Sequence, residues 1–341
     1  MHRANRGEWS ELYAVARILA DGKVTFGEGA QAENHEVLSL RVGDSAFRVD
    51  GLQVELTTVS GEVRRVSREE LHRMAVLLLG AIVGAGDGTG AFPLEVGERV
   101  VELLGLQSVS ASSDSIFDLE IEFAYQAGYF GYSLKSKIGS PATFFNASDL
   151  TNFVYGLSNE RKELYPPQLS LDVGSVRENV HDLVGLGWTF HFVGLAHKGS
   201  PVFQTSLDSI HHGLAKDLSH LVFSYYSSRH NKLAKVIEHA MATTPDPVLF
   251  KNNIYRFITH KSLGLVPSKP WEPPTIPFGG FVFIHRTGEI VGSGLGDPVA
   301  ASATIIEELR FDRPSTTRWH YGKIYKHGRH HAMNLNLQLR W

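Results

Sequence analysis

The 341-residue sequence contains no cysteine and no long apolar run. The missing thiols exclude disulfide bonds and thiolate metal sites, as is usual for proteins of a reducing compartment. The most apolar stretch, 75–83, is much shorter than the roughly 20 residues of a membrane-spanning helix. The first eight residues are polar and lack the apolar core of a secretory signal. These absences favour a cytoplasmic, bacterial-type protein without a membrane partner.

Positive charge is not in excess either, because the net charge is −3. Such a balance is unusual for proteins that bind nucleic acids only by attraction to phosphates. A sequence-specific DNA-binding protein needs only local basic clusters, and an acidic metal site would offset their charge. Basic clusters occur at 64–68, 229–235 and 318–329. The 17 histidines show no zinc-ligand spacing. The composition is therefore compatible with DNA binding.

The hydrophobic pattern predicts a mixed protein of the α/β (α+β) class. Apolar residues with helical spacing predict helices at 8–20, 67–83, 148–157 and 229–241. Stretches rich in apolar and β-branched residues predict strands at 37–42, 51–59, 116–124 and 129–137, and a hairpin at 281–291. The last residues alternate between apolar and polar side chains, which predicts a final strand with one polar face.

The strands at 116–124 and 129–137 carry the residues with the clearest chemical potential. Asp118 and Glu120 share one face of the first strand, and Ser133 and Lys135 share one face of the second. If the connecting loop is 125–128, Asp118 lies opposite Lys135 and Glu120 lies opposite Ser133. Opposed side chains of an antiparallel pair lie close together. The hairpin therefore brings a carboxylate and an ammonium group together.

This combination suits phosphodiester hydrolysis. The reaction needs a metal ion to polarise the phosphate, carboxylates to hold the metal, and often a lysine to orient the attacking water. The alternative interpretation is an ordinary amphipathic hairpin with ion pairs on its wet face, which contribute little to stability. The hairpin alone does not decide between the two.

Several motifs in order along the chain resemble the HpaII-type restriction endonucleases. The similarity extends from the N-terminus to the last strand, with a variable middle. It is carried by Gly7-Glu8-Trp9-Ser10-Glu11, Ser133-Leu134-Lys135-Ser136, Gly139-Ser140-Pro141, Asn146-Ala147-Ser148, Thr151-Asn152-Phe153, Phe278-Gly279-Gly280, Gly322-Lys323-Ile324-Tyr325-Lys326 and Asn334-Leu335-Asn336-Leu337-Gln338-Leu339-Arg340.

The resemblance implies a PD-(D/E)xK-like fold, in which helices flank a mixed central β-sheet, here with additional β-rich elements. It implies a nuclease core at 1–165 with a catalytic hairpin at 116–137, followed by a half at 166–341 for DNA recognition, dimerisation and completion of the sheet, which need not be an independent domain. Asp118 would bind Mg²⁺, and Lys135 would act on the attacking water. The implied activity is that of a type II restriction endonuclease, which cleaves both strands of double-stranded DNA at a CCGG-like site.

One position departs from the family pattern. Ser133 stands where an acid is expected two residues before the lysine, and a serine cannot replace a charged ligand. The second acid must come from elsewhere, and Glu120, Glu11, Glu8 and Asp149 are the candidates. Related nucleases often use a glutamate four residues after a glycine, which matches Gly7 and Glu11, although Glu8 lies nearer the apolar stripe of the helix. We assign Glu11 as catalytic and Glu120, with Asp118, as metal ligands.

A palindromic DNA site calls for a two-fold symmetric protein, so a homodimer is expected. Restriction also implies a cognate cytosine methyltransferase that protects the same site. Polar side chains near the hairpin and on the last strand are the candidates for contacts with bases. They are Ser140, Asn146, Ser148, Asn152, Asn336, Gln338 and Arg340. The rival interpretations are a structure-specific repair or resolvase nuclease, and a DNA-binding regulator with an inactive nuclease fold.

Overall fold

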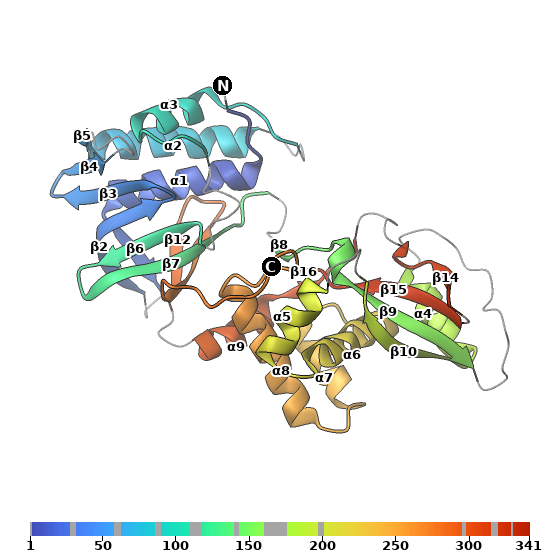
Figure 1. Cartoon of the computed structure of the whole chain (residues 1–341). Coiled ribbons are helices and arrows are strands. Elements are labelled where there is room, and N and C mark those ends of the chain that lie inside the picture. Colours follow the sequence, from blue (N-terminus) through green and yellow to red (C-terminus); the bar gives the residue numbers. More distant parts are fainter. Residues whose placement is uncertain are drawn as a thin grey trace. The chain divides into compact units, whose positions relative to one another are not determined.

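Two compact units make up the chain (Figure 1). Unit 1 comprises Met1–Ala142 and Pro274–Pro298, and unit 2 comprises Thr143–Pro273 and Val299–Trp341. The computed structural model describes residues 2–27, 32–57, 63–85, 90–109, 117–139, 143–159, 176–196, 201–294, 298–314, 320–328 and 330–341. The expected division at residue 165 differs from this arrangement, because the segment 274–298 returns to unit 1.

Among its described residues, unit 1 combines three helices with a nine-stranded sheet. The helices are α1 (Arg6–Asp21), α2 (Arg68–Gly84) and α3 (Glu95–Leu103). The strands are β1 (Lys23–Phe26), β2 (Glu33–Val42), β3 (Ser45–Asp50), β4 (Gln53–Thr57), β5 (Val63–Ser67), β6 (Leu119–Phe123), β7 (Gln126–Ser136), β11 (Phe278–Ile284) and β12 (Ile290–Gly294).

The sheet of unit 1 is mixed, with the order β1-β12-β11-β7-β6-β2-β3-β4-β5. Two neighbouring pairs, β1 with β12 and β11 with β7, are parallel, and the other pairs are antiparallel. Strand β1 also pairs with β2, so six of the strands close into a ring. The late hairpin β11–β12 thus lies beside β7, a strand from the first half of the sequence.

Helix α1 shows how local signals and packing agree. Asn5 caps its start, because the Asn5 side chain accepts a hydrogen bond from the Glu8 amide while the Glu8 carboxylate accepts one from the Asn5 amide. Gly22 ends it in the left-handed conformation, with φ of 61°, and donates to the Ile18 carbonyl. The apolar face of α1, which includes Trp9 and Leu12, is fully buried in the core of unit 1. The predicted helix at 8–20 is therefore confirmed.

Unit 2 combines six helices with two sheets in its described part. The helices are α4 (Val176–Gly185), α5 (Val202–Ile210), α6 (Leu214–Ser227), α7 (Leu233–Met241), α8 (Pro247–Ser262) and α9 (Pro298–Glu308). The four-stranded sheet has the order β10 (Trp188–Leu195), β9 (Asn152–Asn159), β15 (His330–Asn336) and β14 (Ile324–His327). The three-stranded sheet consists of β13 (Arg310–Phe311), β16 (Leu339–Arg340) and β8 (Thr143–Phe145).

The predicted helix at 148–157 is wrong. The signals near Ser148 produce only the short 3-10 turn Asp149–Thr151, and strand β9 begins at Asn152. Alternate residues of β9 face helix α6, where the Tyr155 hydroxyl donates to the Ser219 carbonyl. The residues from Asn152 onward therefore form a strand, and the capping residues near Ser148 do not start a helix.

The predicted final strand divides into two. Strand β15 pairs with β9 and ends at Asn336, and after Leu337 and Gln338 the chain enters β16, which pairs with β8 and β13. Both faces of this segment are buried, so its polar residues are not a wetted face. The alternating pattern at the end of the sequence is therefore divided between two sheets.

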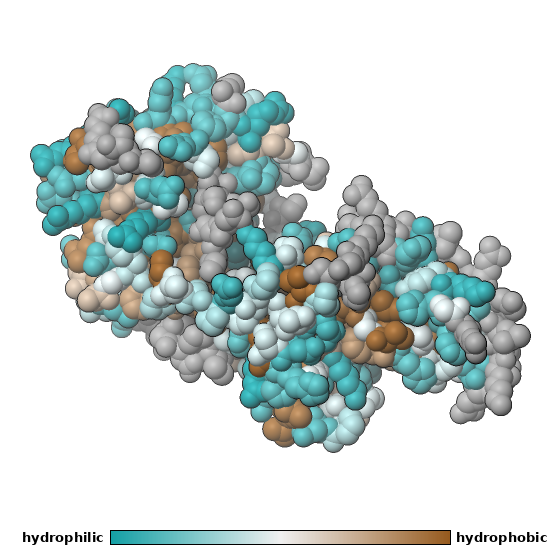
Figure 2. Space-filling model, viewed as in Figure 1, coloured by the Kyte–Doolittle hydropathy of each residue, from teal (hydrophilic) through white to brown (hydrophobic). Residues whose placement is uncertain are grey.

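The mixed α and β class is confirmed, as are the predicted helix at 67–83, which is α2, and the hairpin at 281–291, which is β11–β12. On the face shown in Figure 2, hydrophobic residues form small separate groups within a mainly hydrophilic surface. None of the helices in the described ranges is long and apolar enough to cross a membrane.

Candidate active site

The hairpin β6–β7 has a register two residues away from the expected one. Leu119 pairs with Tyr132 and Glu120 pairs with Gly131, so Asp118 lies across from Ser133 rather than Lys135. The difference arises at the turn, which is only Ala124 and Tyr125 and is followed by an irregularity in the pairing near Phe123. A shift by two keeps every side chain on its predicted face. Asp118 and Lys135 are therefore diagonal neighbours.

Asp118 stands where β6 begins and where its pairing with β7 changes. Its amide donates to the Tyr132 carbonyl at 3.1 Å, and its carboxylate accepts a hydrogen bond from the Leu134 amide at 2.6 Å. A backbone amide of β7 that would otherwise pair with a strand thus holds the Asp118 carboxylate. This contact fixes the acid one residue before Lys135.

An aromatic contact holds the backbone next to Asp118. The Phe117 ring lies directly over Gly131, so that a Cβ at position 131 would overlap the ring. Phe117 also stacks on Phe278 of β11, with ring centroids 6.1 Å apart. Gly131 is therefore required by the close approach of this ring. This packing was not predicted from the sequence.

Helix α1 supplies the third group. Glu11 is partly exposed and interacts electrostatically with both Asp118 and Lys135. Burial and the nearby Asp118 carboxylate raise the pKa of Glu11 to about 8, and Lys135 opposes this rise. Electrostatic interactions thus link Glu11 to Asp118 and Lys135, and the catalytic role of Glu11 stays a prediction. Glu8, the alternative glutamate, is engaged by the N-cap of α1.

Lys135 projects over aromatic side chains of the neighbouring strand. Its backbone pairs with Phe283 of β11, and its ammonium nitrogen lies 5.8 Å from the centre of the buried Phe281 ring. Lys137 repeats this arrangement one pleat further along, with its ammonium nitrogen 5.0 Å from the centre of the Phe283 ring. The aromatic rings of β11 thus lie within cation–π distance of the Lys135 and Lys137 ammonium groups. Their role was not predicted.

Glu120, two residues after Asp118 on the same face of the strand, has a basic neighbour on β2. Glu120 pairs with Arg41 of β2, and the nearest charged atoms of the two side chains are 3.8 Å apart. This neighbour competes with a metal ion for the carboxylate, and the role of Glu120 as a metal ligand stays a prediction.

The site has the ligand chemistry that Mg²⁺ uses. Within the part of the chain that the structure describes, no three acidic or histidine side chains converge as a ready-made metal cluster. Mg²⁺, however, usually keeps several waters and binds through one or two carboxylates together with substrate phosphates. Glu11 and Asp118 supply two such carboxylates, and their mutual repulsion, seen in the raised pKa of Glu11, is what a divalent cation would relieve. The two residues therefore fit a magnesium ion.

Six of the seven residues predicted to contact bases lie in unit 2, and three of these six are buried. Asn336 holds the turn before β9: its amide nitrogen donates to the Ser148 carbonyl at 2.8 Å and to Asn152 Oδ1 at 2.6 Å. Its oxygen accepts from the Thr151 hydroxyl at 2.9 Å. Asn152 and Asn336 are 0% exposed and Gln338 is 6% exposed. These three side chains are therefore part of the unit 2 interior, and their role in contacting bases stays a prediction.

The other candidates have different surroundings. Arg340 places its Nε 2.7 Å from a carboxylate oxygen of Asp312, and Asn146 is exposed. Ser148 is partly exposed and closes the 3-10 turn, in which its amide donates to Thr151 Oγ1. Ser140 lies outside the described residues. A role of these residues in reading bases stays a prediction.

Comparison with known proteins gives a consistent result. The family model described as HpaII restriction endonuclease matches residues 5–341. The type II restriction enzyme HpaII of Haemophilus parainfluenzae is 28% identical over 363 aligned residues, which cover 99% of this chain and 98% of that enzyme. No solved structure matches.

Proposed function

Because this chain belongs to the HpaII restriction endonuclease family, we propose that it hydrolyses phosphodiester bonds in both strands of double-stranded DNA at a specific site. The observation that supports this most directly is the convergence of Glu11, Asp118 and Lys135 at the start of β6. The three groups come from a helix and two strands, so ordinary surface pairing along one element does not explain their meeting.

Each residue has a distinct task in this proposal. Asp118, held by the Leu134 amide, and Glu11 would bind Mg²⁺, which would polarise the phosphate and acidify a water molecule. Lys135 donates hydrogen bonds to the attacking water and stabilises the negative charge that develops on it. Glu11 must lose its proton to serve as a ligand, and the positive charge of Lys135 favours that loss.

The finer features of the function are also proposals. We propose a PD-(D/E)xK-type core for unit 1, because the acid at the start of β6 and the lysine two residues after Ser133 occupy neighbouring strands of a mixed sheet. We further propose a homodimer that cleaves a palindromic CCGG-like sequence. A cytosine methyltransferase of the same specificity would protect this sequence in the host DNA. A two-fold symmetric protein is the natural reader of such a site.

Digestion of plasmid DNA with Mg²⁺, beside an EDTA control, tests the activity. A restriction enzyme gives discrete fragments whose sequenced ends define the site. Nicking only at branched or damaged DNA would indicate a repair or resolvase nuclease instead, and no cleavage would indicate a DNA-binding protein with an inactive site.

Single substitutions test the assignment of the site. We expect Asp118→Asn and Lys135→Met each to slow cleavage by about 10³-fold, because each removes a group that acts on the reacting atoms. Lys137→Met is the matched control, since Lys137 directly follows the same strand and lies over a similar ring. Cleavage at the wild-type rate by either Asp118→Asn or Lys135→Met would remove that residue from the mechanism.

A further inference from the structure

Unit 2 contains a cavity of about 590 Å³ that is lined by residues of α4, the end of α6 and strand β13. Three arginines from separate parts of the chain line it, namely Arg177 on α4, Arg229 after α6 and Arg313 after β13. The basic cluster at 229–235 begins at this cavity. The fold therefore gathers cations that are far apart in the sequence, and we call this place the arginine cavity.

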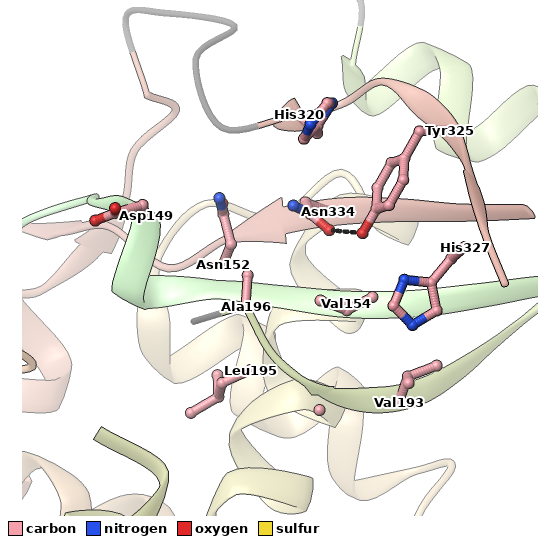
Figure 3. A pocket seen from close by; sticks show the side chains of 11 residues that line it. Asp149, Asn152, Val154, Val193, Leu195, Ala196, His320, Tyr325, His327 and Asn334 are labelled. Carbon is pink, nitrogen blue, oxygen red and sulfur yellow. Dashed lines mark hydrogen bonds between the residues drawn. The ribbon is translucent and has the colours of Figure 1, made fainter. Parts of the chain in front are cut away.

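A second cavity of unit 2, on its four-stranded sheet, has a different character (Figure 3). No arginine or lysine occurs among the described residues that line it. Its walls carry apolar side chains such as Val154 and Val193, and the Tyr325 hydroxyl there donates to Asn334 Oδ1 at 2.7 Å. A negatively charged ligand would therefore find its cationic partners in the arginine cavity.

Several contacts hold Arg177 in one orientation. Its Nε donates to the Ser228 carbonyl at 2.7 Å, and its Nη2 donates to the His230 carbonyl at 2.8 Å. Its guanidinium carbon lies 4.8 Å from the centre of the Tyr225 ring, and that ring stacks on Phe311 with centroids 4.4 Å apart. A planar guanidinium that is already fixed loses little further freedom when it binds a ligand.

These contacts leave part of the Arg177 guanidinium without a partner. A guanidinium has five N–H groups, and Nη1 makes no hydrogen bond with any residue that the structure describes. Burial lowers the pKa of Arg177, and the nearby Arg313 guanidinium lowers it further. A bound anion would accept hydrogen bonds from Nη1 and relieve the repulsion between the two arginines.

Carboxylates also line the cavity, but they do not pair with its arginines. A carboxylate oxygen of Asp312 lies 2.7 Å from Arg340 Nε. Glu178 and Asp182 are exposed on α4, and within the described ranges neither forms an ion pair. Apart from the Asp312–Arg340 pair, three arginines thus face two carboxylates, so the cavity keeps an excess of positive charge.

Arg229 extends this positive charge along the surface of unit 2. Its side chain is exposed and has neither a hydrogen bond nor an ion pair with another described residue. The exposed Lys232 follows three residues later, and the segment 227–237 contains no acidic residue. Such a row of cations suits a polyanion that carries phosphates at regular spacing, rather than one isolated ion.

We propose that the arginine cavity binds a phosphate of the DNA backbone other than the scissile one. Arg177 supplies fixed donors through Nη1, and Arg229 supplies a mobile cation for the same phosphate or the next one. The proposal rests on the proposed function, because it takes double-stranded DNA as the ligand. Contacts with phosphates position a protein on the duplex without reading its sequence. The site would thus hold DNA on unit 2, whereas the candidate active site belongs to unit 1.

The salt dependence of DNA binding tests this proposal. The affinity of the full-length protein is measured between about 50 and about 200 mM salt, and each phosphate contact contributes about 0.9 to the slope of log affinity against log salt. The probes are a duplex that contains the cleaved site and a duplex that lacks it. Ca²⁺ replaces Mg²⁺ so that both duplexes stay intact, and cleavage by the wild-type protein is measured separately in Mg²⁺.

Arg229→Gln should weaken binding of both duplexes by the same factor, about tenfold at the lowest salt, and should reduce the slope by about 1. Arg229→Lys keeps the charge and should keep the wild-type slope. Arg177→Lys should weaken binding of both duplexes, because a lysine cannot hold two carbonyls and a phosphate together, and thermal unfolding checks that its fold is retained. Arg256→Gln removes an exposed arginine of unit 2 outside the cavity lining, and this matched control should bind as the wild-type protein does.

Two results would overturn the proposal. One is an Arg229→Gln variant whose affinity and slope equal those of the wild-type protein, and calorimetric binding of inorganic phosphate that depends on Arg229 would then assign the cavity to a free phosphate. The other is a loss of affinity confined to the duplex with the cleaved site, because Arg229 would then read bases. Both results leave the nuclease assignment intact if the wild-type protein cleaves DNA. Arg229-dependent binding without any cleavage would instead support this site and refute the proposed activity.

Discussion

Replacing Glu11 by glutamine should stabilise the metal-free protein at alkaline pH while abolishing cleavage. The raised pKa of Glu11 means that the folded state holds this proton more tightly than the unfolded chain does. The stability of the wild-type protein therefore falls as the pH rises from 4.5 to about 8, and then levels off. Glutamine does not titrate in this range, so the variant lacks the loss.

The size of the effect follows from the two pKa values. Ionising Glu11 in the folded protein costs at most about 4.8 kcal/mol, at 1.36 kcal/mol for each pH unit between 4.5 and 8. Because the side chain is partly exposed, water screens part of the repulsion from Asp118. We expect Glu11→Gln to raise the free energy of unfolding by about 2 kcal/mol at pH 9, with no gain at pH 5.

Hydrogen exchange at the amides of α1, measured in EDTA at both pH values, reports the stability of the unit that contains Glu11. Glu102→Gln is the matched control, because Glu102 is an exposed glutamate on a helix of the same unit. An equal change in stability at pH 5 and pH 9, or destabilisation at pH 9, would refute the electrostatic account of the site. Loss of cleavage together with a gain in stability would indicate that Glu11 serves function and lowers the stability of the fold.

One further measurement concerns Glu11, and two substitutions test other parts of the structure. Apparent Mg²⁺ affinity, followed by calorimetry, should rise with pH up to about 8 as Glu11 ionises, and a pH-independent affinity would contradict this. Gly131→Ala should displace the Phe117 ring, destabilise the protein by about 2 kcal/mol in urea and slow cleavage, whereas Gly80→Ala, at an open position of α2, should do neither. Asn336→Ala should cost about 3 kcal/mol in thermal unfolding, because it leaves the buried groups around it without hydrogen bonds, and a loss below about 0.5 kcal/mol would argue against that network.

The sequence predicted the strand faces of the candidate active-site residues better than their exact pairing. The alternation of Asp118 and Glu120 with apolar residues determined the strand face, and that face survives a shift of register by two. The length of the turn was misjudged, because the irregular pairing beside Phe123 leaves no mark in composition. Glu11 was proposed from its distance from Gly7 in the family pattern, whereas its electrostatic interaction with Asp118 depends on how α1 packs on the sheet.

Unit 2 was predicted less well, for two physical reasons. Ser148 and Thr151 resemble a helix start, but the helix signal is local, and the pairing of β9 with β10 and β15 decided the outcome. The amide of Asn336 was interpreted as exposed because a polar residue in an alternating strand usually faces water. Only the three-dimensional structure reveals the buried partners that satisfy it.

The order in which the chain is made has a consequence for the candidate active site. Strand β11, whose Phe281 lies beneath the Lys135 ammonium group, is translated after nearly all of the α-helices of unit 2. A ribosome-bound or prematurely terminated chain that stops before residue 278 lacks the strand on which β7 rests. The pairing partner of β7 and the ring beneath Lys135 are thus added only when four fifths of the chain has been made.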